Sequence, residues 1–155
     1  MRGKQAPKRE LTPDTKYGNV MVAKLINYIM RAGKKSVAQA VVYNAFDYIK
    51  EQTQKDPVEI FDTAMKNVQP TVEVKSKRVG GANYQIPIQV RGERRLSLGL
   101  RWLIGAANAK KGRGMALKLG AEIISAANNE GDAVKKKMDV HRMADANRAF
   151  AHFAR

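Results

Sequence analysis

Cysteine is absent from this chain of 155 residues, and acidic residues, aromatic residues and long hydrophobic runs are all scarce. Without cysteine the protein has no disulfide framework, no thiolate nucleophile and no cysteine-based zinc site. No apolar run approaches the roughly 18 residues that a membrane-spanning helix needs. Residues 1–10 are basic but no apolar stretch follows them, so they are not a secretory signal. We therefore expect a soluble, intracellular protein with no membrane partner.

The scarcity of acidic residues leaves the chain strongly basic. Its 29 Lys and Arg residues oppose 14 Asp and Glu residues, which gives a formal net charge of +15. Such an excess favours a polyanionic partner, nucleic acid before an anionic membrane. Basic residues are concentrated between positions 75 and 118, where eleven of them face a single acid, Glu93. Hydrophobic residues make up 44% of the chain, enough for a core, and the length fits one domain.

Hydrophobic spacing predicts a mainly α single domain of about six helices with one projecting two-stranded β-hairpin. Three-and-four spacing begins at Val20 and returns in five later segments, the last of which is predicted to end at about Phe150. The second helix is predicted to begin at Ser36, with a capping box completed by Gln39. The third is predicted to begin after Asp56, because a capping carboxylate stands there before a proline.

Strict alternation of polar and apolar residues around a pair of glycines predicts the hairpin. Alternation places Lys75 and Lys77 on one face and leaves Val74 to pack beneath. Tyr84, near the tip, has two open roles: stacking on an unpaired base, or packing against the protein. Because an isolated two-stranded ribbon is only marginally stable, we expect the hairpin to lean on the helical body, on a ligand or on both.

No motif for catalysis, for a phosphate-binding loop or for a metal is complete. Residues 33–36 (Gly-Lys-Lys-Ser) lack the glycine five residues earlier, where Tyr28 stands, and residues 112–114 (Gly-Arg-Gly) lack a third small residue. His141 and His152 are eleven residues apart, about 16 Å along a helix axis, which is too far for a shared metal. We predict no enzymatic activity, no cofactor and no metal site.

Scattered cationic clusters on a rigid body suit a folded RNA junction that is recognised by its backbone geometry, so RNA is preferred to DNA. A DNA-binding regulator, with a turn near Lys34 between two helices, stays as the alternative. Residues 1–19 form a basic N-terminal arm, either a solvated tail or a binding arm. Residues 20–155 are predicted to form a helical RNA-binding domain, with the hairpin at about 72–90.

Three long segments resemble the bacterial small-subunit ribosomal protein seven family. They are residues 77–87 (Lys-Arg-Val-Gly-Gly-Ala-Asn-Tyr-Gln-Ile-Pro), residues 98–103 (Leu-Gly-Leu-Arg-Trp-Leu) and residues 143–152 (Met-Ala-Asp-Ala-Asn-Arg-Ala-Phe-Ala-His). Shorter similarities lie at residues 26–27, 33–35 and 133–137, so that the resemblance covers nearly the whole chain in order. The chain departs from the family at Phe-Ala-Arg in positions 153–155, where bacterial members usually carry an aromatic residue, arginine and tryptophan.

The resemblance implies a cytoplasmic protein of the ribosome that binds the 3′ major domain of 16S ribosomal RNA and nucleates assembly of the head of the small subunit. It also implies a place near the exit site (E site), with contacts to E-site transfer RNA, to messenger RNA and to the neighbouring small-subunit proteins nine, eleven and thirteen. Carried over by position, ribosomal RNA contacts are expected at Arg2, Lys4, Lys8, Arg9, Lys34, Lys35, Lys75, Lys77, Arg78, Arg94, Arg95, Lys110, Lys111 and Arg113. Proximity to transfer and messenger RNA is expected at Gly80, Gly81, Asn83, Tyr84, Lys136, Arg142 and Arg148.

Overall fold

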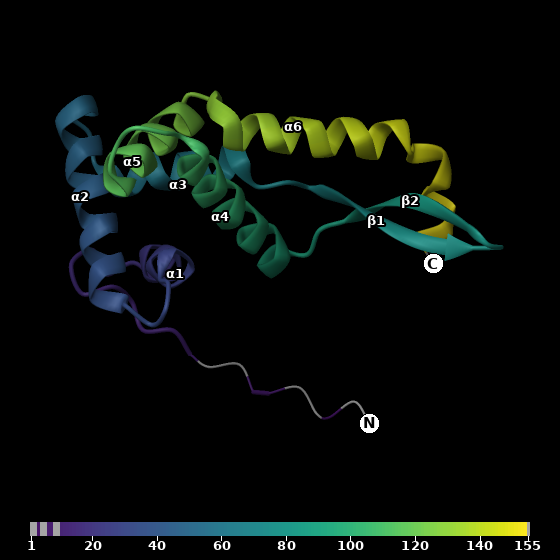
Figure 1. Ribbon diagram of the computed structural model, residues 1–155, viewed down its shortest axis with the longest axis horizontal. Coiled ribbons are helices and arrows are strands. Elements are labelled where there is room, and N and C mark those ends of the chain that lie inside the picture. Colours follow the sequence, from purple (N-terminus) through teal and green to yellow (C-terminus); the bar gives the residue numbers. More distant parts are fainter. Residues whose placement is uncertain (1–2, 4–5, 8–9, 155) are drawn as a thin grey trace.

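The computed structural model describes the chain apart from residues 1–2, 4–5, 8–9 and 155 (Figure 1). A helical body occupies one end of the molecule, and a long arm of one helix beside a hairpin projects from it. The elements in chain order are α1 (Val20–Ile29), α2 (Lys35–Thr53), α3 (Pro57–Val68), β1 (Val72–Val79), β2 (Ala82–Gln89), α4 (Gly92–Ala109), α5 (Met115–Ala127), α6 (Gly131–Ala146) and the 3-10 helix η1 (Arg148–Ala154). The predicted mainly α fold with about six helices and one hairpin is confirmed.

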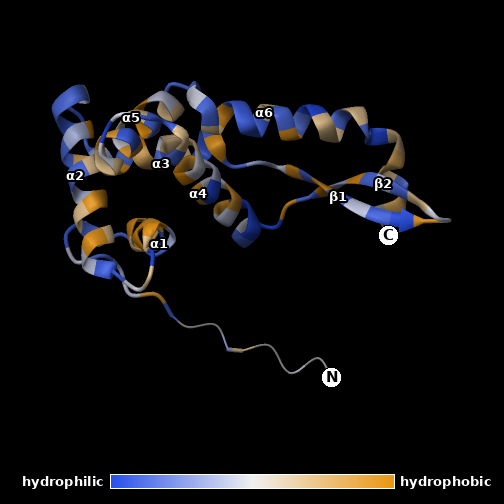
Figure 2. Ribbon diagram, in the orientation of Figure 1, coloured by the Kyte–Doolittle hydropathy of each residue, from blue (hydrophilic) through white to orange (hydrophobic). Residues whose placement is uncertain are grey.

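The core lies where the helices of the body pack around α5. Phe46 of α2 and Phe61 of α3 are fully buried, with ring centroids 5.8 Å apart, and Ile123 of α5 is also fully buried. A methyl group added at Gly120 of α5 would lie 2.7 Å from the Tyr48 ring, so the glycine lets α2 and α5 approach closely. Figure 2 shows that α1 is mostly hydrophobic and α6 mostly hydrophilic, as expected of a helix that lies outside the body.

Side-chain caps set the starts of two helices. The Asn19 side chain accepts from the Met21 amide at 2.7 Å before α1, and the Asp56 carboxylate accepts from the Val58 amide at 3.0 Å before α3. The predicted start at Asp56 is therefore confirmed. The capping box predicted at Ser36 is wrong, because α2 already begins at Lys35 and its N-terminus has no side-chain cap.

The last helix is shorter than the sequence predicts. It ends at Ala146 instead of about Phe150, and the chain continues as the 3-10 helix η1. The Asn147 backbone amide and its side-chain amide both donate to the Met143 carbonyl, at 3.2 and 2.7 Å, so Asn147 caps the last turn of α6. This break redirects the segment after α6 towards the hairpin.

A buried carboxylate joins α4, α5 and α6. Glu122 of α5 is fully buried. One of its oxygens lies 2.6 Å from the Lys110 ammonium, and the other accepts from the Ala133 amide at 3.0 Å. Ala133 belongs to the first turn of α6, where amides lack partners within the helix and the helix dipole favours negative charge. One side chain therefore fixes the end of α4 and the start of α6.

Replacement of Glu122 by alanine is expected to destabilise the fold by about 3 kcal/mol, because Lys110 loses its partner and a buried amide is left unsatisfied. Urea denaturation followed by circular dichroism measures the change. Glu51→Ala, at the exposed end of α2, serves as the control and is expected to change stability by less than about 0.5 kcal/mol. Equal midpoints for the two variants would show that Glu122 does not hold the helices together.

Candidate nucleic-acid interface

The hairpin is a regular antiparallel ribbon with a two-residue turn. Val79 pairs with Ala82, so Gly80 and Gly81 alone form the turn, with φ angles of 57° and 91°. Two consecutive positive φ angles match the twist of the flanking strands and are accessible to glycine without strain. The turn and Asn83 are exposed at the far end of the arm (Figure 1).

The register shows which side of the ribbon packs against the rest of the molecule. Lys75 lies opposite Ile86, and Lys77 lies opposite Tyr84, so these four residues share one face. Because Ile86 is only 2% exposed, this is the packed face, which differs from the predicted arrangement with Val74 beneath. Lys75 and Lys77 nevertheless remain exposed, since long side chains extend past an apolar surface to reach water.

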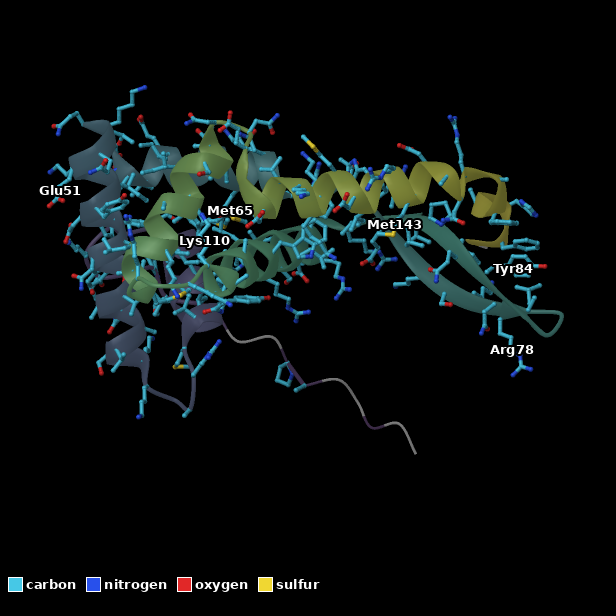
Figure 3. The ribbon with its side chains drawn as sticks, turned by 45° about the horizontal axis from the view of Figure 1, so that its top comes forward. Glu51, Met65, Arg78, Tyr84, Lys110 and Met143 are labelled. Carbon is cyan, nitrogen blue, oxygen red and sulfur yellow. The ribbon has the colours of Figure 1, made fainter. Side chains whose placement is uncertain are left out.

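An aromatic cluster joins the hairpin to η1. The ring centroid of Tyr84 lies 5.2 Å from that of Phe150 and 5.4 Å from that of Phe153. The Lys77 ammonium donates to the Phe153 carbonyl at 2.9 Å. Of the two roles left open for Tyr84, this structure shows packing against the protein. Figure 3 places Tyr84 beside the segment that follows α6, whereas Arg78 points away from it.

The base of the hairpin is fixed to the body by polar contacts. His141 of α6 accepts from the Thr71 amide at 3.2 Å, and Lys137 donates to the Asn67 carbonyl at 2.8 Å. Burial and then the charge of Lys137 lower the pKa of His141, although Asp145 acts in the opposite direction. The hydrogen bond from the Thr71 amide requires an unprotonated Nε2, so it favours the neutral imidazole, in agreement with the lowered pKa.

Arg94 and Arg95 stand in the first turn of α4, next to the hairpin base. Arg94 donates to Glu73 of β1 through Nε at 3.3 Å and Nη2 at 3.2 Å. Arg95 is half-buried, and its charge, after burial, contributes to the lowered pKa of Lys137. Arg94 therefore joins α4 to β1, and Arg95 lies inside this junction rather than on its rim.

Two basic turns of the body lie near each other. A groove between them is lined by Lys34 from the α1–α2 turn and by Asn108 and Met115 at the ends of α4 and α5. Lys34, Lys35, Lys111 and Arg113 are exposed in these turns. Lys110, labelled in Figure 3, is different, because it is half-buried and forms an ion pair with the buried Glu122.

The predicted exit-site residues on and after α6 are all exposed. Lys136 and Arg142 belong to α6, and Arg148 begins η1. Arg142 forms an ion pair with Asp139 at 2.7 Å. These side chains therefore lie along the projecting arm, in the same half of the molecule as the hairpin.

Four predicted residues of the N-terminal arm, Arg2, Lys4, Lys8 and Arg9, lie outside the described residues. The end of that segment does contact the body. Asp14 is 7% exposed and accepts from the Tyr43 hydroxyl of α2 at 2.8 Å. The Tyr17 ring packs on Phe46, with centroids 5.2 Å apart. The sequence did not reveal this anchor, because an aspartate and a tyrosine among basic residues have no periodic signature.

Several predicted cations have no acidic partner within the part of the chain that the structure describes. They are Lys34, Lys35, Arg78, Lys111 and Arg113. They occupy the tip half of the ribbon and the two basic turns of the body. Exposed positive charges without carboxylates nearby are available to phosphate oxygens.

Among the described residues, no three potential metal-binding side chains of His, Cys, Asp or Glu come together. The same residues contain no helix with the length and apolarity to span a bilayer.

A basic helical body with a supported ribbon and exposed cations is typical of proteins that recognise nucleic acid by shape and charge. The model of the family described as ribosomal protein S7p/S5e matches residues 1–148. The chain therefore belongs to the ribosomal protein S7p/S5e family, and the resemblance noted in the sequence is confirmed. Members of this family are structural proteins of the small ribosomal subunit and are not enzymes.

Individual relatives agree over nearly their whole length, and each is named small ribosomal subunit protein uS7. The protein of Thermotoga maritima is 59% identical over 153 residues, which cover 99% of both chains. That of Moorella thermoacetica is 57% identical over 149 residues, 96% of both chains. That of Dechloromonas aromatica is 55% identical over 152 residues, 98% of this chain and 97% of the relative.

Acidification is expected to loosen the hairpin base through His141. Because its pKa is lowered in the folded protein, the unfolded chain binds the proton more readily. The contribution of His141 to stability is complete above about pH 6.5 and is lost as the pH falls through the lowered pKa. The melting temperature is expected to fall between about pH 7.5 and 5.5, and less steeply in His141→Gln. The exposed His152 provides the control: His152→Gln should retain the slope of the unmodified protein.

Removal of the Phe153 ring is expected to loosen the hairpin but not the body. Two aromatic contacts contribute about 1–2 kcal/mol together, so amides of β2 should exchange with solvent about tenfold faster in Phe153→Ala. Hydrogen exchange measured by mass spectrometry tests this, with α5 as the internal reference. Met143→Ala, an exposed residue of α6, should leave exchange in β2 unchanged. Unchanged exchange of β2 in Phe153→Ala would contradict the supporting role of η1.

Proposed function

We propose that this protein binds ribosomal RNA directly and holds a folded RNA junction in shape within the small ribosomal subunit. The observation that carries the proposal is the placement of exposed cations on a supported ribbon and on two adjacent turns of the body; Lys34, Lys35, Arg78, Lys111 and Arg113 have no acidic partner among the described residues. A ribbon is narrow enough to enter a groove of nucleic acid, and cationic turns on a rigid body neutralise phosphates at fixed spacing. Family membership supports RNA over the DNA-binding regulator, the alternative that the sequence left open.

More specifically, we propose that the RNA is the 3′ major domain of 16S ribosomal RNA and that binding nucleates assembly of the subunit head. The body-side contacts would fall to Lys34, Lys35, Lys111 and Arg113, and the ribbon contacts to Lys75, Lys77 and Arg78. Lys110 and Arg94 contribute chiefly by holding elements together, because each pairs with a carboxylate of another element, and Arg95 lies in the α4 junction. Lys75 differs, because its ion pair is with Glu73 of the same strand.

We propose further that the projecting arm faces the exit site. The hairpin turn and the exposed cations Lys136, Arg142 and Arg148 share this arm, as a surface near E-site transfer RNA and messenger RNA requires. We propose in addition that residues 1–19 act as an arm and residues 20–155 as the RNA-binding domain. The proposed neighbours are small-subunit proteins nine, eleven and thirteen, and the proposed location is the ribosome in the cytoplasm.

Binding to a transcript of the 16S RNA junction is expected to weaken steeply with salt. If about eight phosphates are engaged, the logarithm of affinity should fall against that of salt concentration with a slope of about −6. Filter binding or fluorescence anisotropy between about 50 and 300 mM KCl gives this slope. Duplex DNA of equal length is the competitor, and a preference for it would favour the DNA-binding regulator instead.

The two-residue change Lys111→Ala with Arg113→Ala is expected to weaken RNA binding and to reduce the magnitude of the salt slope by about 1.4–1.8, because two phosphate contacts are lost. The matched control is Lys50→Ala with Lys55→Ala, which removes the same charge from the exposed far end of α2 and the loop that follows it. If both pairs change the slope equally, net charge alone is responsible and the proposed contacts at the α4–α5 loop are wrong.

A further inference from the structure

A groove in the helical body has apolar walls and a basic edge. It has a volume of about 340 Å³ and lies where the α1–α2 turn meets the end of α4 and the start of α5. Val37, Ile104 and Met115 supply apolar surface, and Asn108 supplies an amide. Arg31 and Lys34 line the same groove, and neither forms an ion pair among the described residues.

The aromatic wall of the groove is held in a fixed orientation. The Tyr28 hydroxyl donates to the Ser97 hydroxyl oxygen of α4 at 2.8 Å. The Tyr28 residue is 36% exposed, and Val37 is 58% exposed on the opposite helix. Apolar surface left in water is unfavourable by about 25 cal/mol per Å², so this surface is stabilised when a ligand covers it.

The combination of groups matches one nucleotide. An unpaired base has two apolar faces that stack on an aromatic ring and a polar edge that hydrogen-bonds to an amide, and its phosphate carries negative charge. Here the ring is Tyr28, the amide is Asn108, and the cations are Arg31 and Lys34. An acidic peptide would satisfy the cations but would leave the flat ring and the amide without matched partners.

We propose that this groove takes the base of one unpaired RNA nucleotide, stacked against Tyr28, with a flanking phosphate at Arg31 and Lys34. The inference rests on the proposed binding of RNA and adds a site for one flipped-out base to it. The two basic turns that border the groove bind the phosphates of the RNA chain on either side of it. The unpaired base then enters the groove from the RNA strand that these turns bind.

The test combines crosslinking and substitution, with 16S junction RNA as the probe. A benzophenone amino acid at position 37 is expected to crosslink to one unpaired nucleotide, whereas the same group at Met138, 54% exposed on α6, should not reach that nucleotide. Tyr28→Ala should weaken binding about tenfold or more, and Tyr28→Phe, which keeps the ring, by less than about threefold.

Val37→Ser is a second variant, at an exposed site where folding is not at risk, and Met138→Ser is its matched control. Val37→Ser should weaken binding and Met138→Ser should not. Removal of the base from the crosslinked nucleotide should abolish the effect of Tyr28→Ala, because both changes delete the same contact.

Two failures can be told apart. If the unmodified protein does not bind the junction RNA at all, the proposed function is wrong. If it binds with the expected salt dependence but Tyr28→Ala and Val37→Ser bind as tightly as Met138→Ser, only the base-binding groove is wrong. Crosslinks spread evenly over paired nucleotides would also overturn the groove proposal.

Discussion

A ribbon of two strands has no core of its own, so the projecting half of this molecule depends on contacts between the hairpin and the helices beside it. The hairpin gains an apolar neighbour on one face only, where Ile86 is buried and Tyr84 meets the rings of η1. At its base, polar contacts with α6 and α4 fix its direction. The basic side chains of β1 are therefore presented on a supported surface, which reduces the conformational entropy that ordering them on RNA would otherwise cost.

Three acidic residues of this fold join separate elements. Glu122 joins three helices, Glu73 joins β1 to the start of α4, and Asp14 anchors the N-terminal segment to α2. Each carboxylate lies at a junction between elements rather than beside the exposed cations of the ribbon tip and the body turns. The excess of positive charge therefore remains on the outside, where it repels itself until a polyanion is present.

Local sequence signals predicted much of the fold. The features that they did not predict depend on contacts between residues far apart in the sequence. The cap at Asp56 and the glycine pair of the hairpin act over a few residues, so the sequence alone locates α3 and the turn. Ser36 carried an equally good local signal, yet α2 begins one residue earlier, at Lys35, without a side-chain cap. The packing of Tyr84 on Phe153 joins distant segments, and no periodicity in either segment shows it. Clusters of basic residues in the sequence located the candidate interface. Only the structure separates Lys110, which pairs with the buried Glu122, from its exposed neighbours.

The contact between Lys77 and Phe153 spans 76 residues of chain. During synthesis the strands emerge and pair long before their aromatic cover exists, so the ribbon is an exposed edge while α4, α5 and α6 are still being made. Docking of η1 is a late, non-local event that follows formation of the body. A nascent chain halted after α6 would thus carry a complete helical core and an unsupported ribbon, the form of this protein most exposed to mispairing and proteolysis.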